Sequence, residues 1–106
     1  MGASVTLAVD YRFGECSATG KTLNLSEGGM FLCTAGPAPV GTRVSLRFAL
    51  PEAEPWEGTA EVVWIRRPEE QHPYPAGMAL QFVDLPPDAR PAIGAFVARL
   101  LAGPKA

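Results

Sequence analysis

The sequence predicts an all-β fold of six antiparallel strands followed by one C-terminal helix. Six short segments within residues 5–83 are apolar or alternate between apolar and polar residues, as half-buried strands do. The connections between them are too short for the helical crossovers that parallel strands require. Only residues 91–102 show the apolar spacing of an amphipathic helix. These observations favour a small barrel or sandwich, in which closure also removes exposed strand edges.

The first three predicted strands lie on either side of short polar turns. Residues 5–13 alternate strictly, with every second residue apolar, and residues 17–25 repeat this pattern more weakly. Residues 30–34 are a short apolar run bounded by glycines and prolines. All three segments fit strands better than helices, because each is shorter than a typical helix and bounded by turn residues.

The next three predicted strands follow residues 36–42. This segment is too rich in glycine and proline to be part of a helix or a β-strand, so it should form a loop. Residues 43–50 and 77–83 alternate, whereas residues 56–67 are apolar on both faces. Apolar residues on both faces predict a β-bulge or a strand buried on both sides. We expect Trp64, in this strand, to lie in the core.

One helix is predicted at about residues 91–102. Its apolar residues recur at intervals of three and four, and Pro91 suits the first helical position, where a missing N–H costs nothing. Gly103 and Pro104 are typical residues for the end of a helix. The preceding residues 85–90 should form a turn. We expect the helix to lie across one open end or face of the sheet, since it cannot bury its apolar stripe alone.

Length and composition limit the classes of protein. The 106 residues suit a single domain spanning 1–106. With 47% hydrophobic residues, 19% charged residues and a net charge of −2, the chain resembles an ordinary globular protein, and binding to polymeric nucleic acid is disfavoured. No apolar run is long enough to cross a membrane, and no leader sequence is recognisable. We therefore expect a cytoplasmic protein without membrane insertion.

Few residues suggest catalysis or metal binding. Cys16 and Cys33 lack the spacing of a metal site, and His72 is the only histidine. His72 stands among prolines, and the adjacent Glu69 and Glu70 resemble solvated loop acids. The sequence contains neither a nucleophile elbow nor a phosphate-binding loop. We predict no enzymatic activity, no catalytic residues and no bound metal.

The stretch NLSEGGMFL at residues 24–32 permits two interpretations. In the first, Asn24 and Ser26 bond the local turn while Gly28 and Gly29 supply positive φ angles. In the second, the stretch is the floor of a ligand site. There Asn24 would pair with a base edge, Ser26 would donate to a phosphate or base, and Gly29 would let the backbone approach the ligand. Gly28 is a further candidate residue of this vestigial or weak ligand site.

Four segments together resemble the PilZ domain family, the bacterial receptors of cyclic di-GMP and adaptors of pilus and motility control. The segments are NLSEGGMFL, PVGTRVSLRFALP, EVVWIRR and GMALQFVDLPPDAR, and the resemblance extends from Val5 to Leu101. The family pattern [DN]xSxxG is matched by Asn24, Ser26 and Gly29. The resemblance implies a six-stranded antiparallel β-barrel with a C-terminal helix.

One family motif is missing. Members that bind the dinucleotide carry an RxxxR motif just before the first strand, where guanidinium groups grip guanine edges and phosphates. Residues 1–4 are MGAS, without arginine. Arg12 is kept as a weak ligand-binding candidate, although no arginine lies four residues away from it. We expect weak or absent binding of cyclic di-GMP and no other cofactor. The alternative is a genuine receptor whose arginines lie upstream of residue 1 or elsewhere.

Protein–protein contact is the favoured mode of action. Family members that lack the arginines act as adaptors in type IV pilus and motility control, so the resemblance implies a bacterial partner protein. Trp56, at a strand entrance, and Tyr74, in a proline-rich loop, are the predicted contact residues, because tryptophan and tyrosine are favoured anchors of interfaces. The neighbouring Arg66 and Arg67 are interpreted as a solvated strand end.

Overall fold

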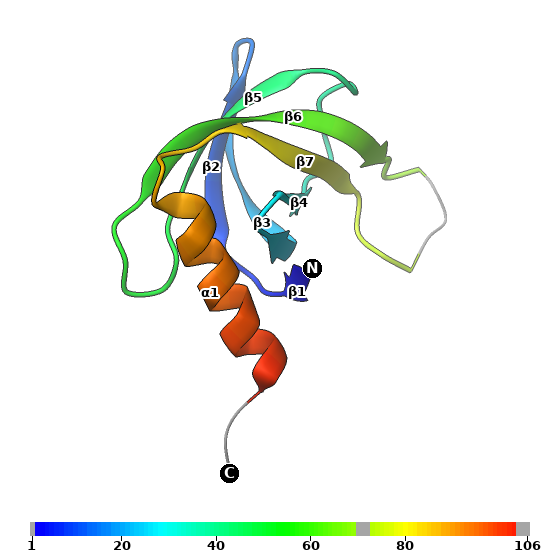
Figure 1. Cartoon of the computed structure of the whole chain (residues 1–106). Helices are drawn as coiled ribbons and strands as arrows, with labels where there is room; N and C mark the ends of the chain where they lie inside the picture. Colours follow the sequence, from blue (N-terminus) through cyan, green and yellow to red (C-terminus); the bar gives the residue numbers. More distant parts are fainter. Residues whose placement is uncertain (1, 70–72, 104–106) are drawn as a thin grey trace.

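The computed structural model describes residues 2–69 and 73–103. These residues form seven strands and one helix (Figure 1). The elements are β1 (Gly2–Ser4), β2 (Ala8–Phe13), β3 (Cys16–Ser26), β4 (Gly29–Cys33), β5 (Arg43–Phe48), β6 (Trp56–Arg66), β7 (Gly77–Asp84) and α1 (Ala89–Ala102).

Six of the strands form a closed antiparallel barrel, which confirms the predicted fold class. The order β3-β2-β5-β6-β7-β4 closes on itself because β4 also pairs with β3. The additional strand β1 lies along β3, with Gly2 opposite Ser26 and Ser4 opposite Asn24. The sequence pattern does not predict β1, since three residues are too few for a recognisable alternation.

The first barrel strand begins later than predicted. Residues 5–7 do not continue β2 but bend around Thr22, which is buried. The Thr22 hydroxyl donates to the carbonyl of Val5 at 2.6 Å and accepts from the Leu7 amide at 2.8 Å. The amide of Thr22 donates to the carbonyl of Leu7 at 3.0 Å. These bonds provide partners for the carbonyl of Val5 and for the amide and carbonyl of Leu7, which lie outside the paired strands. The chain can therefore turn from β1 into β2.

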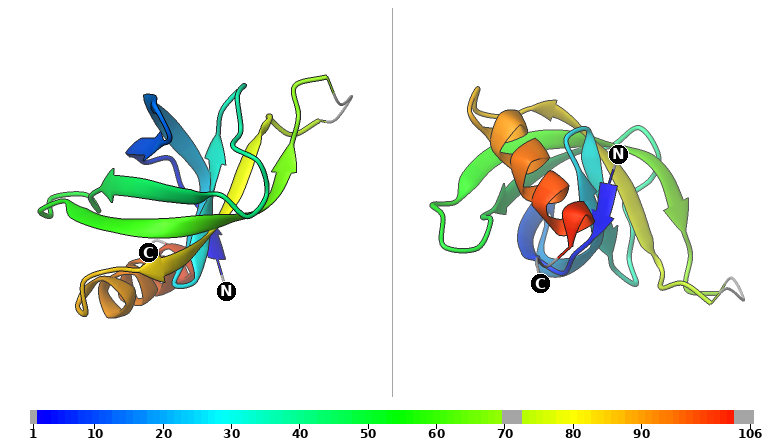
Figure 2. Two further views of the ribbon diagram at one scale, coloured as in Figure 1. Left: turned by 90° about the horizontal axis from the view of Figure 1, so that it is seen from above. Right: turned by 60° about the horizontal axis from the view of Figure 1, so that its bottom comes forward.

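The helix α1 lies across an open end of the barrel, beside β1 and β3 (Figures 1 and 2). Ile93 and Val97 are buried in the same core as the barrel side chains. The helix begins at Ala89, two residues before the predicted start, so Pro91 occupies the third helical position rather than the first. Proline is tolerated there because the first four amides of a helix have no intrahelical acceptor.

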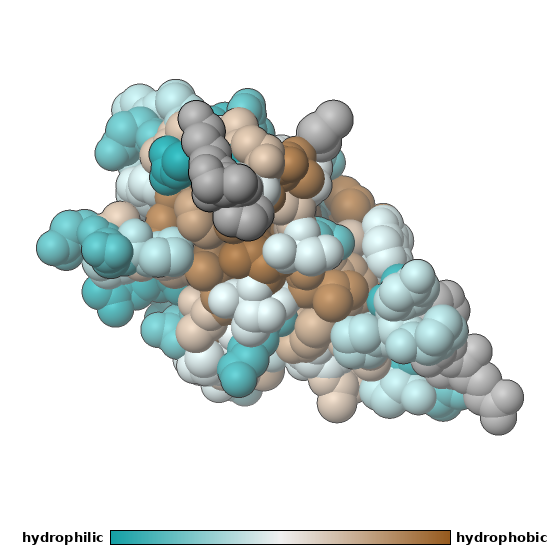
Figure 3. Space-filling view, turned by 90° about the horizontal axis from the view of Figure 1, so that it is seen from below, coloured by the Kyte–Doolittle hydropathy of each residue, from teal (hydrophilic) through white to brown (hydrophobic). Residues whose placement is uncertain are grey.

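The apolar residues of the barrel interior and α1 form one core. Seen from below, apolar residues also gather in the middle of the surface, with hydrophilic residues on either side (Figure 3). Within residues 2–69 and 73–103, no helix has the length and apolar character needed to cross a membrane.

A β-bulge in β6 overturns the expectation for Trp64. Val62 lies opposite Leu80 and Trp64 opposite Ala79, so Val63 is an extra residue without a partner. The bulge was one of the two predicted explanations for the apolar residues on both faces. Its consequence is a shift of the alternation: Val62 is buried, whereas the side chain of Trp64 is 46% exposed. Trp64 is therefore a surface residue, and the prediction that it lies in the core was wrong.

Barrel closure predicts a strong asymmetry between two adjacent glycines. A Cβ atom on Gly29 would overlap the carbonyl oxygen of Leu80 on β7, whereas one on Gly28 would meet nothing closer than the Ser26 hydroxyl at 3.9 Å. We expect Gly29→Ala to lower the free energy of unfolding by about 1–3 kcal/mol, the range for overpacking. Gly28→Ala should change it by less than about 0.5 kcal/mol. Urea unfolding of both variants tests this, and equal effects would contradict it.

Candidate functional site

The turn between β3 and β4 is organised by the side chain of Ser26. Its hydroxyl accepts from the amides of Gly28 and Gly29 at 3.3 and 3.2 Å and lies 3.3 Å from the carbonyl oxygen of Gly29, to which it can donate. The Asn24 side-chain oxygen accepts from the amide of Phe31 at 3.2 Å, across the bulge in β3. Both polar residues of the motif therefore bond the local backbone, as the first interpretation expected.

The first interpretation was wrong about the φ angles of the two glycines. Among the described residues, the glycines with positive φ are Gly14, Gly41 and Gly103. Gly28 and Gly29 are therefore not needed for a left-handed conformation. Gly29 instead permits the close approach of β4 to the backbone of β7, where a side chain would not fit. The second interpretation expected Gly29 to let the backbone approach a ligand. In the structure, Gly29 lets β4 approach the neighbouring strand β7.

The turn is also held from outside by Arg90 of α1. The Arg90 guanidinium donates to the carbonyls of Glu27 at 2.8 Å and Phe82 at 3.2 Å. It also lies over the Phe82 ring, 5.9 Å from the centroid, and the Phe82 amide donates to the carbonyl of Gly28 at 2.8 Å. These contacts connect the turn with β7 and with the first turn of the helix.

A shallow pocket of about 350 Å³ lies beside the turn, between β3, β4, β6 and β7. Its lining residues are all uncharged: Asn24, Ser26, Gly28, Gly29, Met30, Phe31, Val63, Trp64, Ala79, Leu80 and Gln81. A second hollow adjoins it on the β1 side and is lined by Gly2, Ala3, Ser4, Asn24 and Ser26. The structure thus brings together the four predicted motif residues Asn24, Ser26, Gly28 and Gly29.

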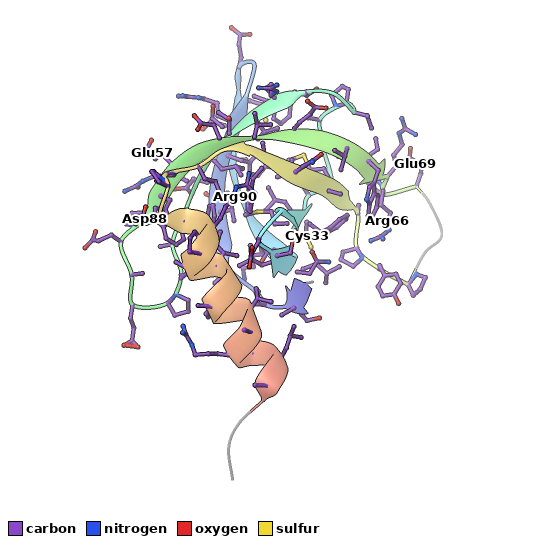
Figure 4. All side chains as sticks on the ribbon, in the orientation of Figure 1. Cys33, Glu57, Arg66, Glu69, Asp88 and Arg90 are labelled. Carbon is purple, nitrogen blue, oxygen red and sulfur yellow. The ribbon has the colours of Figure 1, made fainter. Side chains whose placement is uncertain are left out.

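Aromatic rings surround one cation at the edge of this pocket. The guanidinium carbon of Arg66 lies 5.0 Å from the ring centroid of Phe31 and 5.3 Å from those of Trp64 and Tyr74. Arg66 also donates to the carbonyl of Pro75 at 3.0 Å. Arg66 ends β6, as the prediction of a strand end expected, but it is half-buried against these rings rather than fully solvated. Figure 4 shows Arg66 at the right-hand end of β6, whereas Arg90 lies near the middle of this view, at the start of α1.

Cys33 on β4 lies near this cation (Figure 4). Burial raises the pKa of its thiol, and the positive charge of Arg66 partly opposes that rise. Both cysteines are free thiols. Among residues 2–69 and 73–103, no three histidine, cysteine, aspartate or glutamate side chains gather in a way that could hold a metal ion.

Arg12 does not join the motif residues. It lies opposite Ser17 of β3 and Ser45 of β5. Ser17 is seven residues away from Asn24 along β3, which corresponds to roughly 20 Å of extended strand. Arg12 lines a different, charged hollow together with Asp10, Arg47 and Glu57. A direct contribution of Arg12 to a ligand at Asn24 is not supported by this arrangement.

The two predicted contact residues differ in exposure. Tyr74 is 58% exposed and lies over Arg66, as expected of a surface residue. Trp56 is only half-buried at the other end of β6 and packs edge-on against Phe48 in the core, at a centroid distance of 5.9 Å. Trp64 was missed because the bulge that exposes it has no fixed position in the sequence pattern. His72 and Glu70 lie outside the described residues.

The bonds of Ser26 predict a measurable role in stability. Ser26→Ala would remove the acceptor shared by two backbone amides, so we expect the free energy of unfolding to fall by about 1–2 kcal/mol. Ser17→Ala, at an exposed position of the same strand, serves as the control and should have little effect. Chemical denaturation measures both. A Ser26 variant as stable as the control would show that the turn does not need the hydroxyl.

Seven solved chains resemble this fold, and two of them illustrate the likeness. The structure of the Bacillus subtilis inhibitor of motility, MotI/DgrA, matches 99% of the chain with a TM-score of 0.83 at 18% sequence identity. The chain spans about half of that protein, 51% of its length. The PilZ domain of CeSA from a cellulose-synthesizing bacterium matches 95% of the chain and is itself covered to 98%, with a TM-score of 0.66 and 22% identity. At these identities the likeness concerns the fold.

The family relationship is evident from the sequence, as a match to a family model. A search of curated protein sequences finds no significant match. The model of the PilZ domain family, in contrast, matches residues 3–99, which include the barrel, the polar turn and nearly all of the helix. This match confirms the resemblance inferred from the four sequence segments. The chain belongs to the PilZ domain family.

Proposed function

We propose that this chain is a non-catalytic adaptor that acts through contact with a partner protein, and that residues 1–106 bind cyclic di-GMP weakly or not at all. PilZ domains are in general receptor or adaptor domains without catalytic activity, and members of the family bind cyclic di-GMP and protein partners. In this chain, contact with a partner protein dominates over binding of cyclic di-GMP, and the process it regulates is motility or pilus control.

The neutral strand β1 is the observation that carries the proposal. In ligand-binding members the two arginines precede the first barrel strand. Here the residues that precede the first barrel strand β2 include β1, which lies directly beside the motif, with Ser4 opposite Asn24. A cation in this segment would therefore be well placed to reach a ligand over the turn. Gly2, Ala3 and Ser4 provide none.

The expected energetic effect of the missing cations is large. A hydrogen bond to a charged group contributes on the order of 1.5–3 kcal/mol, so the loss of two such contacts weakens binding by roughly two to four decades. The side chains that remain are also partly engaged, since Ser26 and Asn24 accept hydrogen bonds from the turn and from β4. A doubly anionic ligand would have to compete for these groups without a compensating charge.

A gain-of-binding variant tests the charge argument. We expect isothermal titration of the unmodified chain with cyclic di-GMP to give weak or undetectable binding. Ser4→Arg, which places a guanidinium beside Asn24, should tighten binding by about tenfold or more. Ser4→Gln, a long neutral side chain at the same exposed position, is the control.

Two results would count against this proposal. Submicromolar binding to the unmodified chain would mean that other groups replace the arginine pair. Equal affinities of the Ser4→Arg and Ser4→Gln variants would mean that charge at this position is not what limits binding. The alternative function, a receptor with arginines upstream of residue 1, is tested by the same titration on the natural full-length protein.

A further inference from the structure

The outer surface of the barrel carries a second small apolar cluster. Phe31 is 3% exposed but does not belong to the main core. It is covered by Trp64, whose ring centroid lies 5.3 Å away, and by the Arg66 guanidinium. Together with Val63 and Tyr74, these side chains form what we call the Trp64 face.

The Trp64 face is incompletely buried. Val63, Trp64 and Tyr74 are 41%, 46% and 58% exposed. The bulge in β6 produces this exposure, because it leaves two consecutive large side chains, Val63 and Trp64, at the surface. Bulges that redirect side chains in this way are frequent beside functional sites. Tryptophan, tyrosine and arginine are also the residues that most often dominate binding energy at protein interfaces.

Arg66 gives the Trp64 face its charge. The neighbouring Arg67 is paired with Glu69 at 3.9 Å, whereas no carboxylate among the described residues forms a salt bridge with Arg66. The pocket next to it is lined by uncharged residues alone. Contacts with three rings and with the carbonyl of Pro75 hold the Arg66 side chain in place. A fixed cation loses little conformational entropy when a partner binds.

We propose that the Trp64 face binds a segment of a partner protein that carries a carboxylate beside an apolar side chain. The carboxylate pairs with Arg66, and the apolar side chain enters the pocket next to Trp64. Charge complementarity identifies the occupant, because the cation Arg66 lies at the edge of a pocket whose lining is uncharged and partly aromatic. This inference rests on the proposed adaptor function and names the chemistry of its partner.

Peptide selection provides the probe for this surface. Random peptides displayed on phage are selected against the immobilised chain, and one enriched peptide is synthesised for titration. We expect the enriched sequences to contain aspartate or glutamate next to an aromatic or aliphatic residue. Selections that enrich no peptide, or only peptides without carboxylates, would overturn the proposal.

Substitutions then locate the binding site. Trp64→Ala should weaken binding of the synthetic peptide by about thirtyfold or more, and Arg66→Gln by about tenfold or more. Leu101→Ala, at a similarly exposed apolar position of α1, and Arg47→Gln, in the separate charged hollow, are matched controls and should bind as the unmodified chain does. Thermal unfolding of each variant verifies that it is folded.

The two proposals fail in different ways. If folded Trp64→Ala and Arg66→Gln variants bind the peptide as well as the controls do, the Trp64 face is not the contact surface, although the chain can still be an adaptor. If the unmodified chain binds cyclic di-GMP tightly, and Trp64→Ala abolishes that binding, the face is a nucleotide site. That result would overturn both proposals.

Discussion

Closure of the barrel between β3, β4 and β7 is the constraint on which the rest of this structure depends. The chain must reverse within two residues after Ser26 and then pair with two strands at once. The reversal is possible because the Ser26 hydroxyl accepts hydrogen bonds from the amides of Gly28 and Gly29. It also requires that Gly29 has no side chain, since the backbone of β7 lies close to it. The motif that marks a ligand site in the family lies, in this chain, at the turn where the barrel closes between β3, β4 and β7.

The fold was largely predictable from the sequence, because alternation and short loops leave few arrangements for six antiparallel strands. Departures occurred where tertiary contacts override the pattern. The buried hydroxyl of Thr22 bends residues 5–7 away from the ladder, and the bulge at Val63 turns Trp64 from the core to the surface. The bend at Thr22 has no local signal. The two-sided apolar pattern of residues 56–67 indicated that a bulge was possible but not where it lies, because its position depends on which strands become neighbours.

The sequence predicted which residues gather at one pocket, whereas ligand binding by them stays a prediction. Asn24, Ser26, Gly28 and Gly29 line that pocket, while Arg12 and Trp56 lie elsewhere. The cation that does border the pocket, Arg66, comes from a strand distant in sequence. Residue type identifies a plausible ligand group, but only the pairing of strands decides which groups share a surface.

The contact of Arg90 with the turn links two regions of the chain that are 63 residues apart. One guanidinium donates to the carbonyls of Glu27 and Phe82, and it belongs to the first turn of the helix that lies across the end of the barrel. A signature that looks self-contained in the sequence therefore depends on a distant arginine for its shape. Homologues that keep the nine residues of this turn but replace the arginine would retain the motif in sequence. They would lack the hydrogen bonds from the helix to the turn and to β7.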